Sequence, residues 1–199
     1  YDEKGMPAKT GVGIFARMFM DAFPLLPVEE EGRLHDPQLR ENFIERIFAL
    51  RRWREVRSAG SPRGALEDFH TRHKLLLLSH STKLYQEMGK LVAEQKRYPL
   101  KELWAKYEEL LMEALKLKTT PKKNINVLMH MMGYFREKLS ADEKKELLEL
   151  FERYAQGYLP LIVPLTLLGH YLRKYDEPYL KEQIYLNPHP LELQLRNHV

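Results

Sequence analysis

Apolar side chains recur at helical spacing along most of the chain, and no stretch alternates between apolar and polar residues as a β-strand would. Residues 65–96 predict one long helix, and Pro99 opens a second with a wide apolar stripe. Residues 121–138 predict a third helix, with Thr119 or Thr120 as its N-cap and Pro121 at the first helical position. Its expected core face is Ile125, Leu128, Met129, Met132 and Phe135. The pattern predicts an all-α bundle of about six to eight helices.

Upstream of residue 65, Asp36 and Pro37 provide an N-cap and a first helical residue for a helix that ends in an arginine-rich segment. Its expected core positions are Leu39, Phe43, Ile44, Ile47 and Leu50. Residues 58–64, SAGSPRG, have the composition of a linker and predict a domain boundary. Residues 1–15 read as mid-domain sequence. We therefore expect an irregular N-terminal segment that belongs to a longer protein.

Local signals also divide the C-terminal third of the chain. Residues 140–143, Ser-Ala-Asp-Glu, predict a capping box, and Gly157 predicts the end of the helix that follows. Residues 161–175 predict a mostly apolar, central helix, and a short helix ends before Pro188. The terminal segment is too short to fold without support, so we expect the polar residues 196–198 to lie on a frayed tail.

The composition is that of a folded and mildly basic protein. The 199 residues carry a formal net charge of +4 and have an isoelectric point of about 9.1, which permits a polyanionic partner without requiring one. With no cysteine, the chain by itself cannot form disulfides, thiolate zinc sites or cysteine-ligated iron–sulfur clusters. The longest apolar stretch, residues 158–169, is too short to span a membrane, and no signal peptide is recognisable, so we expect a cytoplasmic protein. No catalytic motif is present, and we assign no catalytic residue.

The helix predicted from residue 121 begins with positive charge, although a helix N-terminus is already the positive end of a dipole. An anion would reverse this unfavourable arrangement, so Lys122 and Lys123 are either phosphate contacts or solvated surface residues. Lys123, Asn126, His130 and Gly133 follow one another at helical spacing, opposite the expected core. They could line a groove for a sugar–phosphate chain, or Asn126 and His130 could be satisfied by internal hydrogen bonds.

Three histidines, His70, His73 and His80, fall on one face of the predicted long helix. The first two have the spacing of shared metal ligands, but leucines interleave this face and no acidic ligand accompanies it, which favours a half-buried polar seam between helices. At the end of the apolar helix, Arg173 and Lys174 suit the C-terminal dipole. The 11 tyrosines could stack on unpaired bases, although aromatic residues at helical spacing are more often core.

Long motifs in the chain resemble the YbgA family. They are FHTRHKLLLLSHSTKLY, TTPKKNINVLMHMMGYF, YLPLIVPLTLLGHYLRKY and YLNPHPLELQLRNHV, which together cover about residues 65–199. Residues 11–55 resemble the tail of a TudS-like thiouracil desulfidase domain, behind which members of that family can be fused. The resemblance implies two units. Residues 1–57 would be the tail of the upstream α/β domain with an arginine-rich joint, and residues 65–199 would be a YbgA-like all-α domain.

The same resemblance implies a tRNA 4-thiouridine desulfidase of the RudS type. In such proteins the upstream domain holds an iron–sulfur cluster on three cysteines and removes the sulfur, and the YbgA-like domain is thought to bind the tRNA. The cysteine-bearing part would precede Tyr1, so we expect this chain alone to catalyse nothing and to hold no cofactor or metal. Its expected partners are tRNA and the upstream domain in the same polypeptide.

The residues expected to contact RNA lie on the helix from residue 121, at the end of the apolar helix and in the arginine-rich joint. They are Lys118, Lys122, Lys123, Asn124, Asn126, His130, Tyr134, Arg173, Lys174, Arg51, Arg52 and Arg54. Two other functions remain open from the sequence. One is a metal-dependent enzyme that uses the face of the three histidines, and the other is a protein-interaction domain.

Overall fold

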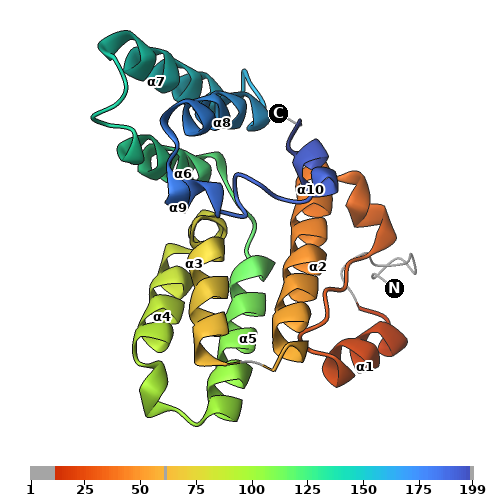
Figure 1. The fold of residues 1–199 in the computed structure, drawn as a ribbon. Helices are drawn as coiled ribbons and strands as arrows, with labels where there is room; N and C mark the ends of the chain where they lie inside the picture. Colours follow the sequence, from red (N-terminus) through yellow and green to blue (C-terminus); the bar gives the residue numbers. More distant parts are fainter. Residues whose placement is uncertain (1–11, 61, 198–199) are drawn as a thin grey trace, which may run out of the picture.

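The computed structural model describes residues 12–60 and 62–197, so most of the segment that reads as mid-domain sequence lies outside the described residues. Within them the chain is helical and has no strand, which confirms the predicted all-α class (Figure 1). The described elements are α1 (Ile14–Ala22), η1 (Glu31–His35), α2 (Pro37–Ser58), α3 (Arg63–His80), α4 (Thr82–Ala93), η2 (Gln95–Arg97), α5 (Leu100–Lys116), α6 (Pro121–Tyr134), α7 (Ala141–Ala155), α8 (Ile162–Tyr175), α9 (Pro178–Lys181), α10 (Pro190–Gln194) and η3 (Leu195–Asn197), where η marks a 3₁₀-helix.

The prediction of one long helix over residues 65–96 is wrong, because Ser81 leaves the helical conformation. Its backbone is extended (φ −158°, ψ 112°), and its hydroxyl accepts a hydrogen bond from the N–H of Leu84. Ser81 therefore ends α3 and caps α4. The chain folds back at this point, and the two helices pack against each other.

The predicted capping residues are present at the other helix ends. Asp36 caps α2 and Thr120 caps α6, each through a side-chain oxygen that accepts from a backbone N–H. Ser140 and Glu143 form the reciprocal capping box at the start of α7. Gly157 follows α7 with a φ of +77°, a conformation that favours glycine over residues with a Cβ atom. These local predictions are confirmed.

The helices form two groups that meet at α3. In Figure 1, α2, α3, α4 and α5 lie side by side in the lower half, and α6, α7 and α8 lie above them. Because α3 packs against α4, α5 and α6, it connects the groups. Between α2 and α5, Trp53 stacks on Tyr107 with ring centroids 5.0 Å apart, and Trp104 and Phe69 also contact the Trp53 ring.

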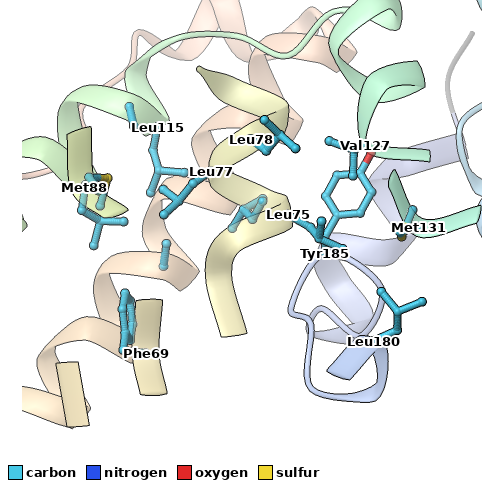
Figure 2. Close-up of a cluster of buried hydrophobic side chains, with 14 of the residues drawn as sticks. Phe69, Leu75, Leu77, Leu78, Met88, Leu115, Val127, Met131, Leu180 and Tyr185 are labelled. Carbon is cyan, nitrogen blue, oxygen red and sulfur yellow. The ribbon is translucent and has the colours of Figure 1, made fainter. Parts of the chain in front are cut away.

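The core face of α6 is rotated from the predicted one. Leu128 and Phe135 are buried as expected, but Val127 and Met131 are also fully buried, and Met129 faces solvent. Because α6 packs against α3 on one side and α7 and α8 on the other, its buried surface is wider than a single stripe. Figure 2 shows this part of the core, in which Leu75, Leu77, Leu78, Val127, Met131, Leu180 and Tyr185 are labelled.

The core face predicted for α2 is only partly right, since Leu50 is buried as expected but Leu39, Phe43 and Ile44 are only partly buried. Ile47 is exposed, whereas Glu41, Glu45, Ala49 and Trp53, spaced four residues apart, are buried. The apolar positions of α2 cover the interior only in part, and polar side chains enter it instead. Since Ala49 and Trp53 lie in the same core cluster as α3 and α5, α2 packs with the helices that follow the predicted linker.

The two ends of the described chain behave differently. The C-terminal segment is held against α2 by contacts of α10 and η3, and Arg196 is only 2% exposed, so the expectation of a frayed tail is wrong for this residue. His198, which we also expected on this tail, lies outside the described residues. α1 buries none of its residues, and Ile14 and Phe15 are 81% and 83% exposed. No helix of the described segments combines the length and apolarity needed to cross a membrane.

Candidate nucleic-acid interface

The start of α6 places its two lysines in different surroundings. The Lys123 ammonium donates hydrogen bonds to the backbone carbonyls of His80 (2.7 Å) and Lys118 (2.9 Å). The carbonyl of His80 belongs to the last turn of α3, so the positive charge at the start of α6 neutralises the negative end of another helix. Lys122 and Lys118 are exposed. Of the lysine pair, Lys122 is the one whose side chain can reach a phosphate in this conformation.

Asn124 lies inside the protein, although we expected it at the RNA surface. Its side-chain amide donates to the hydroxyl of Tyr154 (2.8 Å), and its oxygen accepts from the hydroxyl of Tyr185 (2.9 Å). With its side chain buried and both ends hydrogen-bonded, Asn124 joins α6 to α7 and to the segment before α10. Asn124 is therefore not part of the candidate RNA surface.

Beside Asn124, a buried ionic network connects α2, α3 and the C-terminal segment. The Arg196 guanidinium lies 3.0 Å from a carboxylate oxygen of Glu45 and 3.6 Å from one of Glu41. Arg196 also donates to the backbone carbonyl of Tyr185 (2.5 Å). On the other side of the network, Nε2 of His80 lies 3.3 Å from the second oxygen of Glu45. We call Glu41, Glu45, His80 and Arg196 the ionic interior.

The ionic interior gives its two carboxyl groups opposite properties. Burial by itself would raise the pKa of Glu45, but the hydrogen bond and charge of His80 and the charge of Arg196 outweigh burial and lower that pKa. For Glu41, burial and the charge of Glu45 raise the pKa to about 8. At neutral pH Glu45 is therefore ionised and Glu41 is mostly protonated. An adjoining cavity of about 70 Å³ has room for water but not for a nucleotide.

Sequence reasoning missed the ionic interior, because Glu41 and Glu45 look like solvated charges and Arg196 is near the chain end. One signal was available. Glu41, Glu45, Ala49 and Trp53 follow one another at four-residue spacing, and the last two belong to the aromatic and apolar core. A helix face that ends in buried Ala and Trp predicts that the acids on the same face are buried as well.

The arginine-rich joint divides between the interior and the surface. Arg52 forms an ion pair with Glu192 of α10, and its guanidinium lies over the ring of Phe48. Arg51 is exposed and pairs with Glu55 at 2.9 Å. Arg54 is also exposed, and Arg51 and Arg54 line a groove of about 610 Å³ together with Leu26, Pro27, Ile47, Leu50, Glu55 and Ser58. Arg51 and Arg54 therefore remain surface candidates, and Arg52 holds the C-terminal segment.

The exposed side of α6 carries Asn126, His130 and Tyr134 at four-residue spacing; we call these three residues the α6 stripe. Tyr134 is 43% exposed and stacks on Tyr179 of α9, with ring centroids 5.1 Å apart and planes inclined by 21°. Burial raises the pKa values of Tyr179 and of Tyr85 of α4, and the phenol of Tyr134 adds to the increase in both. We call Tyr85, Tyr134 and Tyr179 the tyrosine patch.

At the end of α8, the two predicted cations differ. Arg173 is exposed. Lys174 donates to a carboxylate oxygen of Glu143 at 2.7 Å, and its ammonium lies over the ring of Tyr175. The hydrogen bond from Lys174 and those from Ser140 lower the pKa of Glu143 to about 2. Lys174 thus ties α8 to the capping box of α7, and Arg173 is the more available of the two cations.

The three histidines of α3 occupy the interior and do not converge. His70 Nδ1 lies 3.0 Å from the hydroxyl of Tyr107, His73 Nδ1 lies 2.7 Å from the carbonyl of Phe69, and His80 belongs to the ionic interior. Among residues 12–60 and 62–197, no three His, Asp or Glu side chains are grouped so that they could hold a metal ion. The positions agree with a polar seam between α3 and its neighbours.

The fold and these surfaces define a small all-helical domain with a buried ionic interior and with tyrosines and cations exposed at its surface. The chain belongs to the DUF1722 family, described as a protein of unknown function, whose pattern matches residues 74–190. The uncharacterized protein YbgA of Escherichia coli (strain K12) is 35% identical over 158 residues, which are 79% of this chain and 94% of that protein. No solved structure gives a significant match. Membership of the YbgA family is confirmed, and the association with a TudS-like desulfidase domain stays a prediction.

Proposed function

We propose that this chain is a tRNA-binding helical module that presents thiolated tRNA to an upstream desulfidase domain. The observation that carries the proposal is the tyrosine patch, which shares Tyr134 with the α6 stripe. Unpaired RNA bases bind by stacking on aromatic side chains, at about 1–3 kcal/mol per base, and the half-exposed Tyr134 supplies such a ring at the surface. His130 and Asn126 extend the same helix face with groups that can hydrogen-bond to the sugar–phosphate chain.

Exposed cations support the same proposal. Lys118 and Lys122 stand at the other end of the α6 stripe, and the formal net charge of the chain is +4. Arg51, Arg54 and Arg173 are further exposed cations on α2 and α8. Positively charged side chains neutralise RNA phosphates and release counterions, which gives affinity without sequence preference. The chain therefore offers both of the contributions that single-stranded RNA binding needs, stacking and charge.

The sulfur chemistry would lie outside this chain. The 199 residues contain no cysteine, so they cannot supply the three cysteine ligands of the iron–sulfur cluster that the proposed enzyme requires. The bare apolar face of α1, with Ile14, Phe15 and Met18 exposed, supports a neighbouring domain on this side of the molecule. In the proposed arrangement, α1 contacts the desulfidase domain and α6 contacts the RNA.

The test is the affinity of the chain for thiolated and unthiolated tRNA, measured by fluorescence anisotropy at several salt concentrations. Tyr134→Ala should weaken binding on the order of tenfold, because a stacked base is lost. Tyr158→Ala is the matched control, since Tyr158 is 71% exposed in the turn after α7, away from the tyrosine patch, and its loss should leave the affinity unchanged. Lys122→Gln should lower the slope of log affinity against log salt by about 0.7–0.9.

The same experiment separates the competing functions. Wild-type chain that binds no tRNA at low salt would overturn the proposal and leave a protein-interaction domain, for which the apolar face of α1 is the first surface to examine. Equal loss of affinity in Tyr134→Ala and Tyr158→Ala would show that the tyrosine patch has no special role. One mole of zinc or iron per mole of purified chain would instead favour a metal-dependent enzyme.

A further inference from the structure

A groove of about 530 Å³ runs between α3 and α4, which lie side by side in Figure 1. Its lining residues are Glu67, His70, Thr71, Lys74, Tyr85, Gln86, Gly89, Val92, Ala93 and Gln95. The volume is within the range of small-molecule sites, which is about 300–1,000 Å³. One wall is Tyr85, a member of the tyrosine patch, so the groove opens beside the surface proposed to bind RNA. The lining mixes aromatic, cationic and amide groups.

His70 presents an unpartnered hydrogen-bond donor to this groove. The ring is 3% exposed, and its Nδ1 lies 3.0 Å from the hydroxyl of Tyr107. Burial raises the pKa of Tyr107 well above its ordinary value and lowers that of His70 to about 4, so both groups are neutral. Nδ1 is the acceptor that the structure offers to the Tyr107 hydroxyl, which places the imidazole proton on Nε2. Nε2 is buried without a hydrogen-bond partner among the described residues.

Gln95, at the end of the same groove, presents the complementary group. Its side-chain oxygen is buried and accepts no hydrogen bond within the part of the chain that the structure describes. Its backbone carbonyl accepts from Arg63, which fixes the position of the residue at the start of η2. A buried polar group without a partner costs about 1–3 kcal/mol, so a donor and an acceptor left open in one groove indicate that another molecule supplies their partners.

Gly89 keeps the groove open. It lies in the middle of α4, where glycine is less favourable than alanine by about 1 kcal/mol. A Cβ atom at this position would meet one neighbour within 4 Å, Nε2 of His70, at 3.7 Å. Backbone conformation therefore does not require glycine here, and neither does a close approach of helices. The missing side chain leaves space beside the unpartnered Nε2 of His70.

We propose that the groove between α3 and α4 binds the base of one unpaired nucleotide. The edges of nucleobases carry both hydrogen-bond acceptors and donors, the groups that the Nε2–H of His70 and the side-chain oxygen of Gln95 lack as partners. The ring of Tyr85 lies nearly parallel to that of His70, at 13°, and gives a stacking face. Lys74 lines the groove within reach of the nucleotide phosphate, and Thr71 can hydrogen-bond to the ribose.

The proposal rests on the proposed RNA-binding function where the nucleotide is part of a strand, because the strand would reach the groove across the tyrosine patch. A free nucleoside monophosphate has the same base, ribose and phosphate and would occupy the groove in the same way. A lone mononucleotide is expected to bind weakly, on the order of millimolar, since it gains few contacts for its lost freedom of motion. The two sources are separated by measuring both ligands on the same variants.

The experiment titrates the full chain with each of the four nucleoside monophosphates by NMR chemical shifts, and with tRNA by anisotropy. Gly89→Leu should raise or hold the melting temperature, because leucine is a better helix former, and should weaken mononucleotide binding at least tenfold by filling the groove. Gln95→Leu should likewise hold or raise stability while it weakens binding. Gly169→Ala, in the middle of α8, is the matched control that improves helix propensity away from the groove.

Each outcome decides a different point. Loss of both mononucleotide and tRNA affinity in Gly89→Leu assigns the groove to a nucleotide of the RNA strand, and loss of mononucleotide affinity alone assigns it to a free nucleotide. One combination of results would overturn nucleotide binding by the groove and leave the proposed function standing. In that combination, mononucleotides cause no chemical-shift changes in the wild type, and tRNA affinity is unchanged in Gly89→Leu but reduced in Tyr134→Ala. If the chain binds mononucleotides specifically but binds no tRNA, the proposed function is overturned and nucleotide binding by the groove stands.

Discussion

The ionic interior and the groove between α3 and α4 both bury polar side chains, but they satisfy them differently. In the ionic interior, Glu45 lies 3.0 Å from Arg196 and 3.3 Å from Nε2 of His80, so the buried carboxylate has the Arg196 guanidinium as a counter-charge beside it. In the groove, Nε2 of His70 and the side-chain oxygen of Gln95 have no hydrogen-bond partner among the described residues. Paired buried charges hold three parts of the chain in one arrangement. Unpaired polar atoms beside open space indicate where a ligand belongs.

The largest expected effect comes from breaking the ionic interior at Arg196. Arg196→Met keeps much of the side-chain volume but leaves the Glu45 carboxylate buried beside Glu41 without the guanidinium that lies 3.0 Å from it. Removing one partner of a buried pair costs about 3–5 kcal/mol, so we expect a loss of that size in the free energy of unfolding. Urea denaturation measures it.

The control for this change is Arg54→Met, at an exposed position of α2, which should alter the free energy of unfolding by less than about 0.5 kcal/mol. Gln95→Leu in the groove provides the contrast, because it removes an unsatisfied acceptor and should not destabilise the fold. If Arg196→Met and Gln95→Leu changed stability by the same amount, the distinction between the two polar regions would be wrong.

Stability should respond to pH in opposite directions at His70 and His73 of α3 and at Glu41 of the ionic interior. Burial lowers the pKa of His70 to about 4 and of His73 to about 3. Below pH 6.5 the unfolded chain therefore binds protons at these histidines that the folded chain does not bind. Their contribution is present above pH 6.5 and is lost as the pH falls toward 3. The pKa of Glu41 is raised to about 8, so the folded chain keeps a proton that the unfolded chain releases above pH 4.5. The Glu41 contribution is lost as the pH rises from 4.5 toward 8.

Denaturation curves between pH 4 and pH 9 check these slopes. Glu41→Gln should flatten the loss of stability on the alkaline side, and His73→Gln should flatten the loss on the acid side. His73 stacks on Phe69, with ring centroids 3.9 Å apart, so His73→Gln will also lower stability at every pH. The slope is therefore the deciding measurement for that variant. An unchanged alkaline slope in Glu41→Gln would show that Glu41 is ionised in the folded protein at neutral pH.

The smallest expected effect separates the two lysines at the start of α6. Lys123→Gln should lower the free energy of unfolding by about 1 kcal/mol, because the ammonium hydrogen-bonds to the carbonyls of His80 and Lys118. Lys122→Gln should leave stability within about 0.5 kcal/mol and act on RNA affinity instead. Melting temperatures of the two variants, measured side by side, decide the assignment. Equal stability of both would return Lys123 to the candidate RNA surface.

The sequence predicted the features that depend on a few neighbouring residues. The caps at Asp36, Thr120 and Ser140 and the turn at Gly157 follow from hydrogen bonds and backbone conformations that form within one helical turn, and the structure has all of them. The all-α class followed in the same way from the spacing of apolar side chains. The break at Ser81 was missed, because the apolar spacing continues across it while the serine caps the second helix.

The sequence could not show which polar residues enter the interior. Glu41 and Glu45 are separated from Arg196 by about 150 residues, and a buried charge is tolerated only where folding brings its counter-charge within a few ångströms. The same reasoning applies to Asn124 and Lys123. Their residue types suit an RNA surface, but a distant phenol or carbonyl takes up their hydrogen bonds in the folded chain. Burial of a polar group depends on partners far along the chain, so only the tertiary structure decided it.

The sequence by itself therefore determined the all-α class, several helix ends, the net charge and the family of the chain, because each depends on residue type and short-range spacing. The tertiary structure decided which faces of α2 and α6 are buried, how the C-terminal segment is anchored and which cations remain exposed. It also decided that His70 and Gln95, 25 positions apart, open into one groove. The physical reason is that packing and hydrogen bonding are settled between elements, after the chain has folded back on itself.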